Sequence, residues 1–397
     1  MKNKQLVFGL ILSLCVVLFS CKKNEEEIDN TKKEESGNTI VNTNISNNTT
    51  WTNDKVYELA GRITVLNGVT LTIEPGTIIK GQAGSGANST ALLVARGGKL
   101  IAEGTASKPI IFTSVADEIT PAQVLSGNFA SPNLDPNIGG LWGGLIILGK
   151  AKISASNEGG QLSEIQIEGI PTSDSNGLYG GDDNNDNSGI LKYISIRHGG
   201  TNIGSGNEIN GLTLGGVGSG TVIDNIEIVA NDDDGIEFFG GTVNVTNIIS
   251  WNVKDDGLDT DQAWEGSCTN FIIITPSGHC FELDGPEGNY NNTGHLFEKG
   301  YIIASDENTT AQDLINIDDN SVVKLKDITF VSVANSQQIN NITASGVIFE
   351  GINIDVPAED LPNHVNGAVP TGVTSGNTMH VNKSVFSWTW AYVAGKI

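Results

Sequence analysis

The sequence predicts an all-β fold, a right-handed single-stranded parallel β-helix with coils of about 22 to 24 residues. Three observations lead to this prediction. Glycine occurs 49 times while charged residues make up only 17% of the 397 residues, which disfavours coiled coils and helical bundles. Two columns of short apolar strands repeat with one period, and asparagine recurs in phase with the second column. The net charge of -24 also argues against nucleic acid as a partner.

The repeat is clearest in the middle of the chain. A first strand begins at residues 211, 235, 257 and 280, in steps of 24, 22 and 23 residues, and a second strand begins at residues 223, 245 and 268. Fixed repeats of this length, with period-two strands and turn residues, bury their apolar faces only by stacking coil on coil. Leucine-rich repeats have similar lengths, but their leucine spacing is absent. We expect the β-helix domain to span residues 51–397, with loop insertions near 115–140 and 156–189.

Asparagine occupies one position of the second column, at Asn225, Asn247 and Asn270. In a parallel β-helix the coils rise by about 4.8 Å, so these side chains would stack along the axis. Their amides can then bond to one another as an asparagine ladder.

Acidic residues form two further columns in the first strand. Because Ile236, Leu258 and Phe281 must point into the core, the alternating residues point outward on one sheet. Like charges one coil apart repel by roughly 3 kcal/mol at an effective dielectric near 20, and Ca²⁺ would relieve this repulsion through oxygen ligands. The alternative is a hydrated acidic face with raised pKa values and no specific ion. The candidate calcium ligands of these columns are Glu237, Asp259, Asp261, Glu282, Asp284 and Asp318.

A second candidate calcium site lies at residues 182–189, where oxygen-bearing side chains alternate. Asp182 and Asp186 are its acidic members. The match to a calcium loop is partial, since Asn187 stands where glycine is usual and no glutamate follows at the expected distance. The alternative is a plain loop rich in asparagine and aspartate.

Catalysis on this scaffold is the rival to binding. Asp259-Thr260-Asp261, Asp255-Asp256 and Gly278-His279 echo parts of inverting β-helix hydrolases, but their order departs from the hydrolase pattern and no basic residue is clearly placed. Trp251 and Trp264 fall near the acidic columns and could stack on sugar rings, or could merely cover a corner of a coil.

The N-terminus has the pattern of a lipoprotein leader. Lys2 and Lys4 precede an apolar run that ends in Leu-Phe-Ser-Cys at Cys21, which resembles a lipobox whose cysteine is acylated. We therefore expect a signal peptide at 1–20 and a lipidated flexible tether at 21–50, with an ordinary secretory signal as the alternative. The acidic run after Cys21 resembles the export tag of surface lipoproteins in some Gram-negative bacteria. Cys268 and Cys280 remain in the domain, as buried thiols or as a disulfide.

Several sequence segments resemble those of a known family, at residues 71–77, 102–105, 108–114, 142–149 and 233–243. They resemble Gram-negative bacterial surface lipoproteins with a parallel β-helix of the pectate-lyase-like fold, over roughly residues 65–390. The function of that family is poorly defined, so the resemblance implies a fold and an outer-membrane location rather than a reaction.

These observations together predict a non-catalytic, lipid-anchored cell-surface protein. It would bind a polysaccharide or a surface protein, with structural Ca²⁺, and the two insertions would set partner specificity. The alternative is a calcium-dependent polysaccharide lyase or glycoside hydrolase that acts on polyuronate-type substrates.

Overall fold

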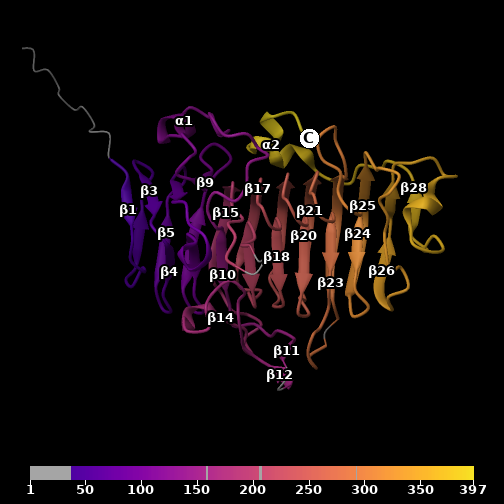
Figure 1. Cartoon of the computed structure of the whole chain (residues 1–397), viewed down its shortest axis with the longest axis horizontal. Helices are drawn as coiled ribbons and strands as arrows, with labels where there is room; N and C mark the ends of the chain where they lie inside the picture. The colour runs from indigo at the N-terminus through magenta and orange to yellow at the C-terminus, as the bar shows by residue number, and fades with distance from the viewer. Residues whose placement is uncertain (1–36, 158–159, 205–207, 292) are drawn as a thin grey trace, which may run out of the picture. The chain divides into compact units, whose positions relative to one another are not determined.

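The computed structural model describes residues 37–157, 160–204, 208–291 and 293–397. The predicted signal peptide, Cys21 and the first part of the tether lie outside the described residues. The described chain winds as a parallel β-helix, and its coils contribute strands to two extended parallel sheets (Figure 1). The predicted fold class is confirmed. Among the described residues, no helix combines the length and the hydropathy that a membrane crossing requires.

One sheet has eight strands, all parallel, in which each coil adds one short strand. In chain order these strands are β4 (Arg62–Val65), β7 (Ala91–Val94), β10 (Leu145–Leu148), β16 (Leu212–Gly215), β18 (Ile236–Phe239), β20 (Leu258–Asp261), β22 (Phe281–Leu283) and β24 (Ile315–Ile317).

The other sheet has sixteen strands and two arms. Early coils supply the arms separately, with β2 (Thr49–Trp51), β5 (Thr70–Ile73) and β8 (Lys99–Glu103) in the first arm, and β1 (Thr39–Val41), β3 (Val56–Leu59), β6 (Ile78–Gly81) and β9 (Ile110–Ser114) in the second. Later coils join both arms in one long strand: β15 (Gly189–Arg197), β17 (Val222–Val229), β19 (Val245–Trp251), β21 (Ser267–Ile274), β23 (His295–Ile303) and β25 (Val322–Val331). The last coils add β26 (Gly346–Glu350), β27 (Ile352–Ile354) and β28 (Val373–Ser375).

A left-handed backbone position separates the two arms of each long strand. Asn225, Asn247 and Asn270 have φ values of 58°, 57° and 60°, a conformation that asparagine tolerates better than most residues. Asn270 donates to the side chain of Asn247 over 2.6 Å, as the ladder predicts, but Asn247 donates to Asp224 over 2.7 Å rather than to Asn225. The asparagine column therefore marks the bend, and only one of its two expected rungs forms.

The core fills the space between the sheets and becomes aromatic in the central coils. Trp264 stacks on Phe238 in this core with ring centroids 3.9 Å apart and is 1% exposed, whereas Trp251 is fully buried in a separate apolar cluster with Phe386 and Trp390. The expectation that these two tryptophans stack on sugar rings is therefore wrong, because neither ring reaches the surface. Cys268 and Cys280 are free thiols in the same core, so they act as small apolar residues.

The first coil begins earlier than expected. β1 pairs with β3 and β2 pairs with β5, so Thr39–Val41 and Thr49–Trp51 form strands of the β-helix instead of the end of a flexible tether. The threonine-rich segments supply β-branched side chains that suit paired strands, a local signal that low hydropathy obscured.

Both predicted insertions pack against the β-helix. The first contains α1 (Pro121–Leu125), and its Ile119, Val124 and Phe129 cover the second arm at β3, β6 and β9. The second contains β11 (Ala155–Asn157), β12 (Gly160–Leu162), β13 (Ile165–Gln166), η2 (Ser175–Gly177) and β14 (Leu178–Tyr179), and it covers the outer face of β7, β10 and β18. A further short helix, η1 (Gly86–Asn88), follows β6.

The C-terminal segment returns to the middle of the β-helix, where Figure 1 draws it in yellow beside the central strands. After β28 and the earlier η3 (Leu361–His364), the chain forms η4 (Lys383–Phe386) and α2 (Trp390–Val393). Residues 381–391, called here the strap, pack on the second arm through Phe386 and Trp390, which meet Val229, Trp251 and Ile274.

Candidate acidic site on the eight-stranded sheet

The outer face of the eight-stranded sheet changes from apolar to acidic along the β-helix axis. One column pairs, strand by strand, Leu93, Ile146, Thr213, Glu237, Asp259, Glu282 and Asn316. The second insertion covers Leu93 and Ile146 of this column, and its cover ends at Phe239, which lies on the same strand as the first acid, Glu237. The register predicted for the acidic columns is therefore confirmed.

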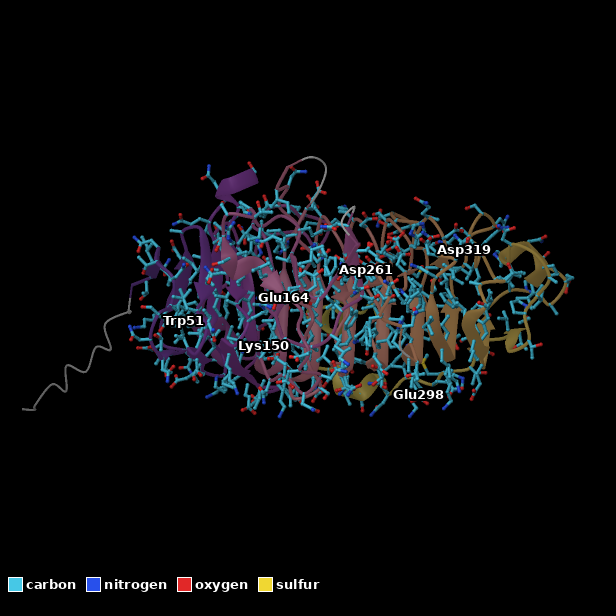
Figure 2. The ribbon with its side chains drawn as sticks, turned by 90° about the horizontal axis from the view of Figure 1, so that it is seen from below. Trp51, Lys150, Glu164, Asp261, Glu298 and Asp319 are labelled. Atoms are coloured by element: carbon cyan, nitrogen blue, oxygen red, sulfur yellow. The ribbon has the colours of Figure 1, made fainter. Side chains whose placement is uncertain are left out.

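The second column continues the same ladder. Asp261 pairs with Phe239, the amide of Asp284 donates to the carbonyl of Thr260 over 2.9 Å, and the amide of Asp318 donates to the carbonyl of Leu283 over 3.0 Å. Asp261 lies about midway along the face, between Glu164 and Asp319 in Figure 2. Asp318 is exposed, whereas Asp261 and Asp284 are half-buried.

The acids at the centre are buried rather than hydrated. Glu237 is 8% exposed and Asp259 is 9% exposed, and the side-chain amide of Asn210 donates to Glu237. On the neighbouring coil the phenol of Tyr179, from the second insertion, donates to Gln262 over 2.9 Å. The alternative of a hydrated acidic face does not hold at Glu237 and Asp259, because both side chains are buried.

Two turn aspartates join the columns. Asp234 brings a carboxylate oxygen to those of Glu237 and Asp259, and the three oxygens all lie within 4.8 Å of one another. Asp234 also accepts a hydrogen bond from the backbone amide of Asp256 over 2.9 Å. Asp234-Gly235 and Asp256-Gly257 recur one coil apart, and Asp-Gly pairs favour turns, so both aspartates shape the turns as well as approach the columns. Their recurrence one coil apart was the signal for the second role.

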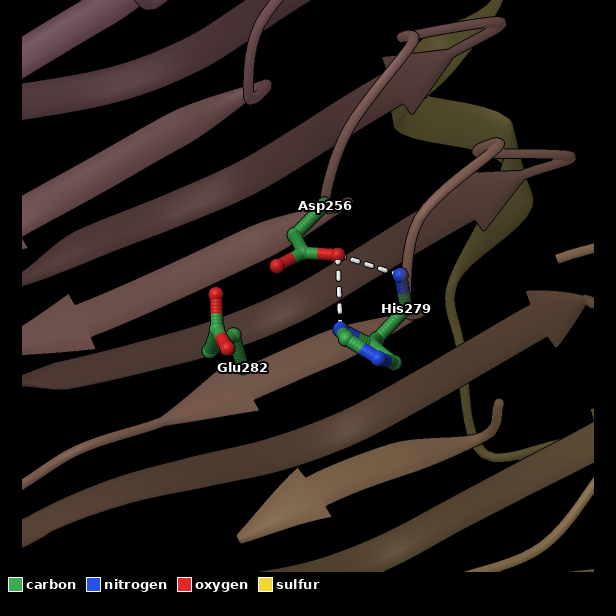
Figure 3. A group of neighbouring side chains, drawn as sticks. All are labelled: Asp256, His279 and Glu282. Carbon is green, nitrogen blue, oxygen red and sulfur yellow. Dashed lines mark hydrogen bonds and ion pairs between the residues drawn. The ribbon is translucent and has the colours of Figure 1, made fainter. Parts of the chain in front are cut away.

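A second group combines Asp256, His279 and Glu282, whose ligand atoms lie within 4.8 Å of one another (Figure 3). The Nδ1 atom of His279 forms an ion pair with Asp256 at 3.1 Å, and its Nε2 atom lies 3.0 Å from the amide nitrogen of Gln312. Burial opposes the charge on His279, but the Asp256 carboxylate outweighs it, so the pKa of His279 is raised. Glu282 in turn accepts a hydrogen bond from Asn316 over 2.8 Å.

Burial first, and neighbouring carboxylates second, raise the pKa of Asp234, Glu237 and Asp259 well above the usual range. The same causes raise the pKa of Asp261 to about 7 and that of Asp284 to about 6. Burial and Asp256 raise the pKa of Glu282 to about 8. Within the part of the chain that the structure describes, no lysine or arginine forms an ion pair with Asp234, Glu237 or Asp259. Negative charge here is left for protons or a cation to neutralise.

The donor set fits a hard cation. Two oxygens bound to one Ca²⁺ at about 2.3 to 2.6 Å can lie up to about 5 Å apart, which the 4.8 Å limit for Asp234, Glu237 and Asp259 satisfies. Asn210 adds a neutral oxygen, because its Oδ1 atom is buried and has no hydrogen-bond partner. The three carboxylates that lie within 4.8 Å of one another would supply part of the roughly six to eight oxygens that Ca²⁺ prefers, and water would complete the shell.

The loop at residues 182–189 uses its oxygens differently. Asn184 accepts from the backbone amide of Lys152 over 3.0 Å, and Asp186 is buried and accepts from Ser188 over 3.1 Å. Asp182 is exposed, and neither aspartate belongs to a group of three potential acidic or histidine ligands among the described residues. An ion in this loop stays a prediction, and the geometry favours the acidic columns.

Comparisons with known proteins point to one family. Residues 43–389 match the model of a family described as a pectate-lyase-like β-helix domain. No curated protein matches the chain. Among solved structures, the catalytic unit of a thermostable GH87 α-1,3-glucanase from Streptomyces thermodiastaticus strain HF3-3 is similar at 12% identity with a TM-score of 0.24. That match covers 85% of this chain and 65% of the glucanase chain, so the chain spans just under two thirds of its length.

Proposed function

The chain belongs to the pectate-lyase-like β-helix domain family, and we propose that on this scaffold it is a cell-surface protein that binds glycans through Ca²⁺ held at its acidic columns. One observation carries the proposal. Asp234, Glu237 and Asp259 bury three carboxylates within 4.8 Å of one another without a basic partner among the described residues. A bound cation that keeps open positions can bridge to the carboxylates or hydroxyls of a polysaccharide.

Calcium binding is tested by calorimetric titration of the metal-free protein. We expect Ca²⁺ to bind and to raise the melting temperature, because a ligand that binds only the folded state stabilises it. Asp259→Asn should abolish both effects, whereas Glu359→Gln, at an exposed turn acid after β27, should abolish neither. A melting temperature that is indifferent to Ca²⁺ in the unmodified protein would remove the cation from the proposal.

Glycan binding is tested with polygalacturonate and neutral polysaccharides, each with Ca²⁺ and with a chelator. We expect polyuronate retention that depends on Ca²⁺ and on Asp259. A purely structural envelope protein would retain none of these glycans.

The second candidate is a polysaccharide lyase or glycoside hydrolase, and the raised pKa values of the acidic columns favour it. Glu282 and Asp261, with pKa values of about 8 and about 7, hold protons near neutral pH, as a general acid must. Asp284, with a pKa of about 6, is largely ionised there. Reproducible cleavage of a polysaccharide in the presence of Ca²⁺, lost in Asp259→Ala or Asp261→Ala, would favour catalysis over binding alone.

The membrane anchor belongs to the same proposal and rests on the sequence around Cys21. We expect the mature protein to partition with the outer membrane through acyl chains on Cys21. Cys21→Ser should release it, and mass spectrometry of the N-terminal peptide should lose the acyl mass.

A further inference from the structure

A polar hollow separate from the acidic columns lies between the eight-stranded sheet and the second insertion. Its volume is about 440 Å³, within the range of small-molecule sites. Asn67, Arg96 and Lys150 line it from the turns that follow β4, β7 and β10, and Glu164, Asn176 and Asp182 line it from the insertion. Figure 2 shows Lys150 and Glu164 beside each other, nearer the N-terminal coils than Asp261.

Two arginines fix the wall that the insertion builds. Arg96 pairs with Glu164 at 2.8 Å and donates to the carbonyl of Gly180 over 2.8 Å. Arg62 pairs with Asp174 at 3.0 Å, and Asp174 also accepts from the backbone and side-chain amides of Asn176, at 3.1 and 2.8 Å. Half-exposed pairs of this kind add little stability, but they orient the side chains that face the hollow.

Lys150 also lines the hollow, and neither of these two ion pairs includes it. Among the described residues it forms no ion pair within 4.0 Å, although its charge and its backbone amide both counter the rise that burial causes in the pKa of Asp186. Lys150 and Asn67 meet above Gly97, where an added Cβ would lie 2.9 Å from Nζ and 2.4 Å from Oδ1. Because Gly97 has no Cβ, both polar ends have room at the hollow, and its left-handed backbone, with φ of 79°, also favours glycine there.

The charges of the hollow balance. Arg96 and Glu164 neutralise each other, which leaves one ammonium on the sheet side at Lys150 and one carboxylate on the insertion side at Asp182. A sugar hydroxyl accepts one hydrogen bond and donates another, so neighbouring hydroxyls satisfy an ammonium and a carboxylate together. A ligand with a net charge would leave one of these two groups opposed by a like charge.

We propose that this hollow binds a neutral sugar unit through Lys150, Asn67 and Asp182, independently of Ca²⁺. The proposal rests on the proposed function for its ligand class, a glycan. It adds a second contact, so that a polysaccharide would be held at the hollow and at the acidic columns.

The test is saturation-transfer NMR of the full chain in a chelator, with the methyl glycosides of glucose, galactose and mannose as neutral probes and glucuronate as the acidic probe. We expect at least one neutral probe to bind more tightly than glucuronate. Lys150→Met and Asp182→Asn should each weaken that binding about tenfold or more. Lys152→Met is the matched control, since Lys152 lies over the Tyr290 ring at 5.4 Å and does not line the hollow, and it should change binding less than about twofold.

Three results would overturn the inference: no binding of any neutral probe, tighter binding of glucuronate, or neutral-sugar binding that survives both substitutions in variants whose melting temperatures match the parent. Because the chelator removes Ca²⁺, failure here leaves calcium-dependent retention at Asp259 to be judged separately. Loss of that retention would in turn leave chelator-resistant sugar binding intact.

Discussion

The same central coils bury carboxylates on two faces in opposite ways. On the sixteen-stranded sheet, Glu227 is fully buried and lies 3.7 Å from Arg197, and it accepts from Ser195 over 2.6 Å and from the backbone amide of Ala391 over 2.9 Å. On the eight-stranded sheet, Glu237 is almost as buried, yet its neighbours are Asp234 and Asp259. On the sixteen-stranded sheet, protein groups compensate the buried carboxylate. On the eight-stranded sheet, the buried carboxylates face one another.

This difference separates a structural charge from a candidate binding charge. Burial raises the pKa of Glu227, and Arg197, Ser195 and Ala391 counter it. Around Glu237 nearly every influence has the same sign, apart from the hydrogen bond from Asn210. Folding alone gains nothing from concentrating like charges, so the negative charge of the acidic face is left for protons or for the proposed cation to neutralise.

The largest expected change in stability is on the sixteen-stranded sheet, where Arg197 compensates the charge of Glu227. Glu227→Ala leaves Arg197 buried without its carboxylate, and we expect a loss of about 3 to 5 kcal/mol in the free energy of unfolding. Denaturant titration measures it. The double variant Arg197→Met with Glu227→Leu should recover more than half of the loss, and a single-variant loss below about 1 kcal/mol would contradict the comparison.

The strap is the next largest contributor. Trp390 meets Trp251 edge to face at 5.8 Å and lies 5.1 Å from the Arg197 guanidinium, so Trp390→Ala should cost about 3 kcal/mol. Hydrogen exchange should show lost protection on β17, β19 and β21. Tyr392→Ala, at a side chain that is 43% exposed, should cost less than about 0.5 kcal/mol. Equal costs for the two variants would show that the strap is not anchored through Trp390.

On the eight-stranded sheet, removing a buried acid should stabilise the metal-free protein at high pH, whereas removing Glu227 from the other sheet should destabilise it. Since the folded pKa of Glu237 is raised, its stabilising contribution is complete below its ordinary value of 4.5 and is lost as the pH rises. Without Ca²⁺, Glu237→Gln should therefore match the parent near pH 4 and exceed it at pH 8 by about 1 to 2 kcal/mol. With Ca²⁺ the order at pH 8 should invert. Thermal unfolding across this pH range measures both effects.

A matched control distinguishes the stabilisation expected for Glu237→Gln from a general effect of removing one acidic side chain. Glu298 pairs with Lys326, and its pKa is lowered by that partner. Glu298→Gln should change stability by less than about 1 kcal/mol, with no gain at pH 8. A gain of similar size in both variants would mean that overall net charge, and not the acidic columns, governs the pH dependence.

The smallest expected effect is at the bend between the arms. Asn247→Gly keeps the left-handed backbone but removes the bonds to Asn270 and Asp224, so we expect a loss of about 1 kcal/mol. Asn225→Gly, in the same column but without a bond to Asn247, should change stability by less than about 0.5 kcal/mol. Equal losses would mean that the rungs themselves contribute nothing.

The repeat could be predicted from the sequence because it is local and periodic. The alignment of Thr213, Glu237, Asp259, Glu282 and Asn316 follows from the coil period alone, and the strands pair in that register. Outward direction also follows from alternation. The solvent exposure of these side chains cannot be predicted in this way, since it depends on which other segments cover the sheet.

The parts that escaped prediction are the non-periodic ones. The second insertion covers one end of the acidic face and the strap covers Trp251, and both contacts join residues far apart in the sequence. The contact between the strap and Glu227 lies outside the repeat, since Ala391 and Glu227 are 164 residues apart in the sequence. Asp234 and Asp256 recur before glycine one coil apart in the sequence, but their convergence on the columns depends on how the turns fold over the sheet.

The strap also changes how the β-helix can come apart. Stacked coils hold only their neighbours, so an end coil ordinarily frays first and unzipping proceeds inward one coil at a time. Here the chain that leaves the last coils is fastened by Trp390 and the backbone of Ala391 to strands near the middle. The terminal coils are thereby closed into a loop, so a pulling force on the C-terminus would meet the central Arg197 and Glu227 before it reached β28.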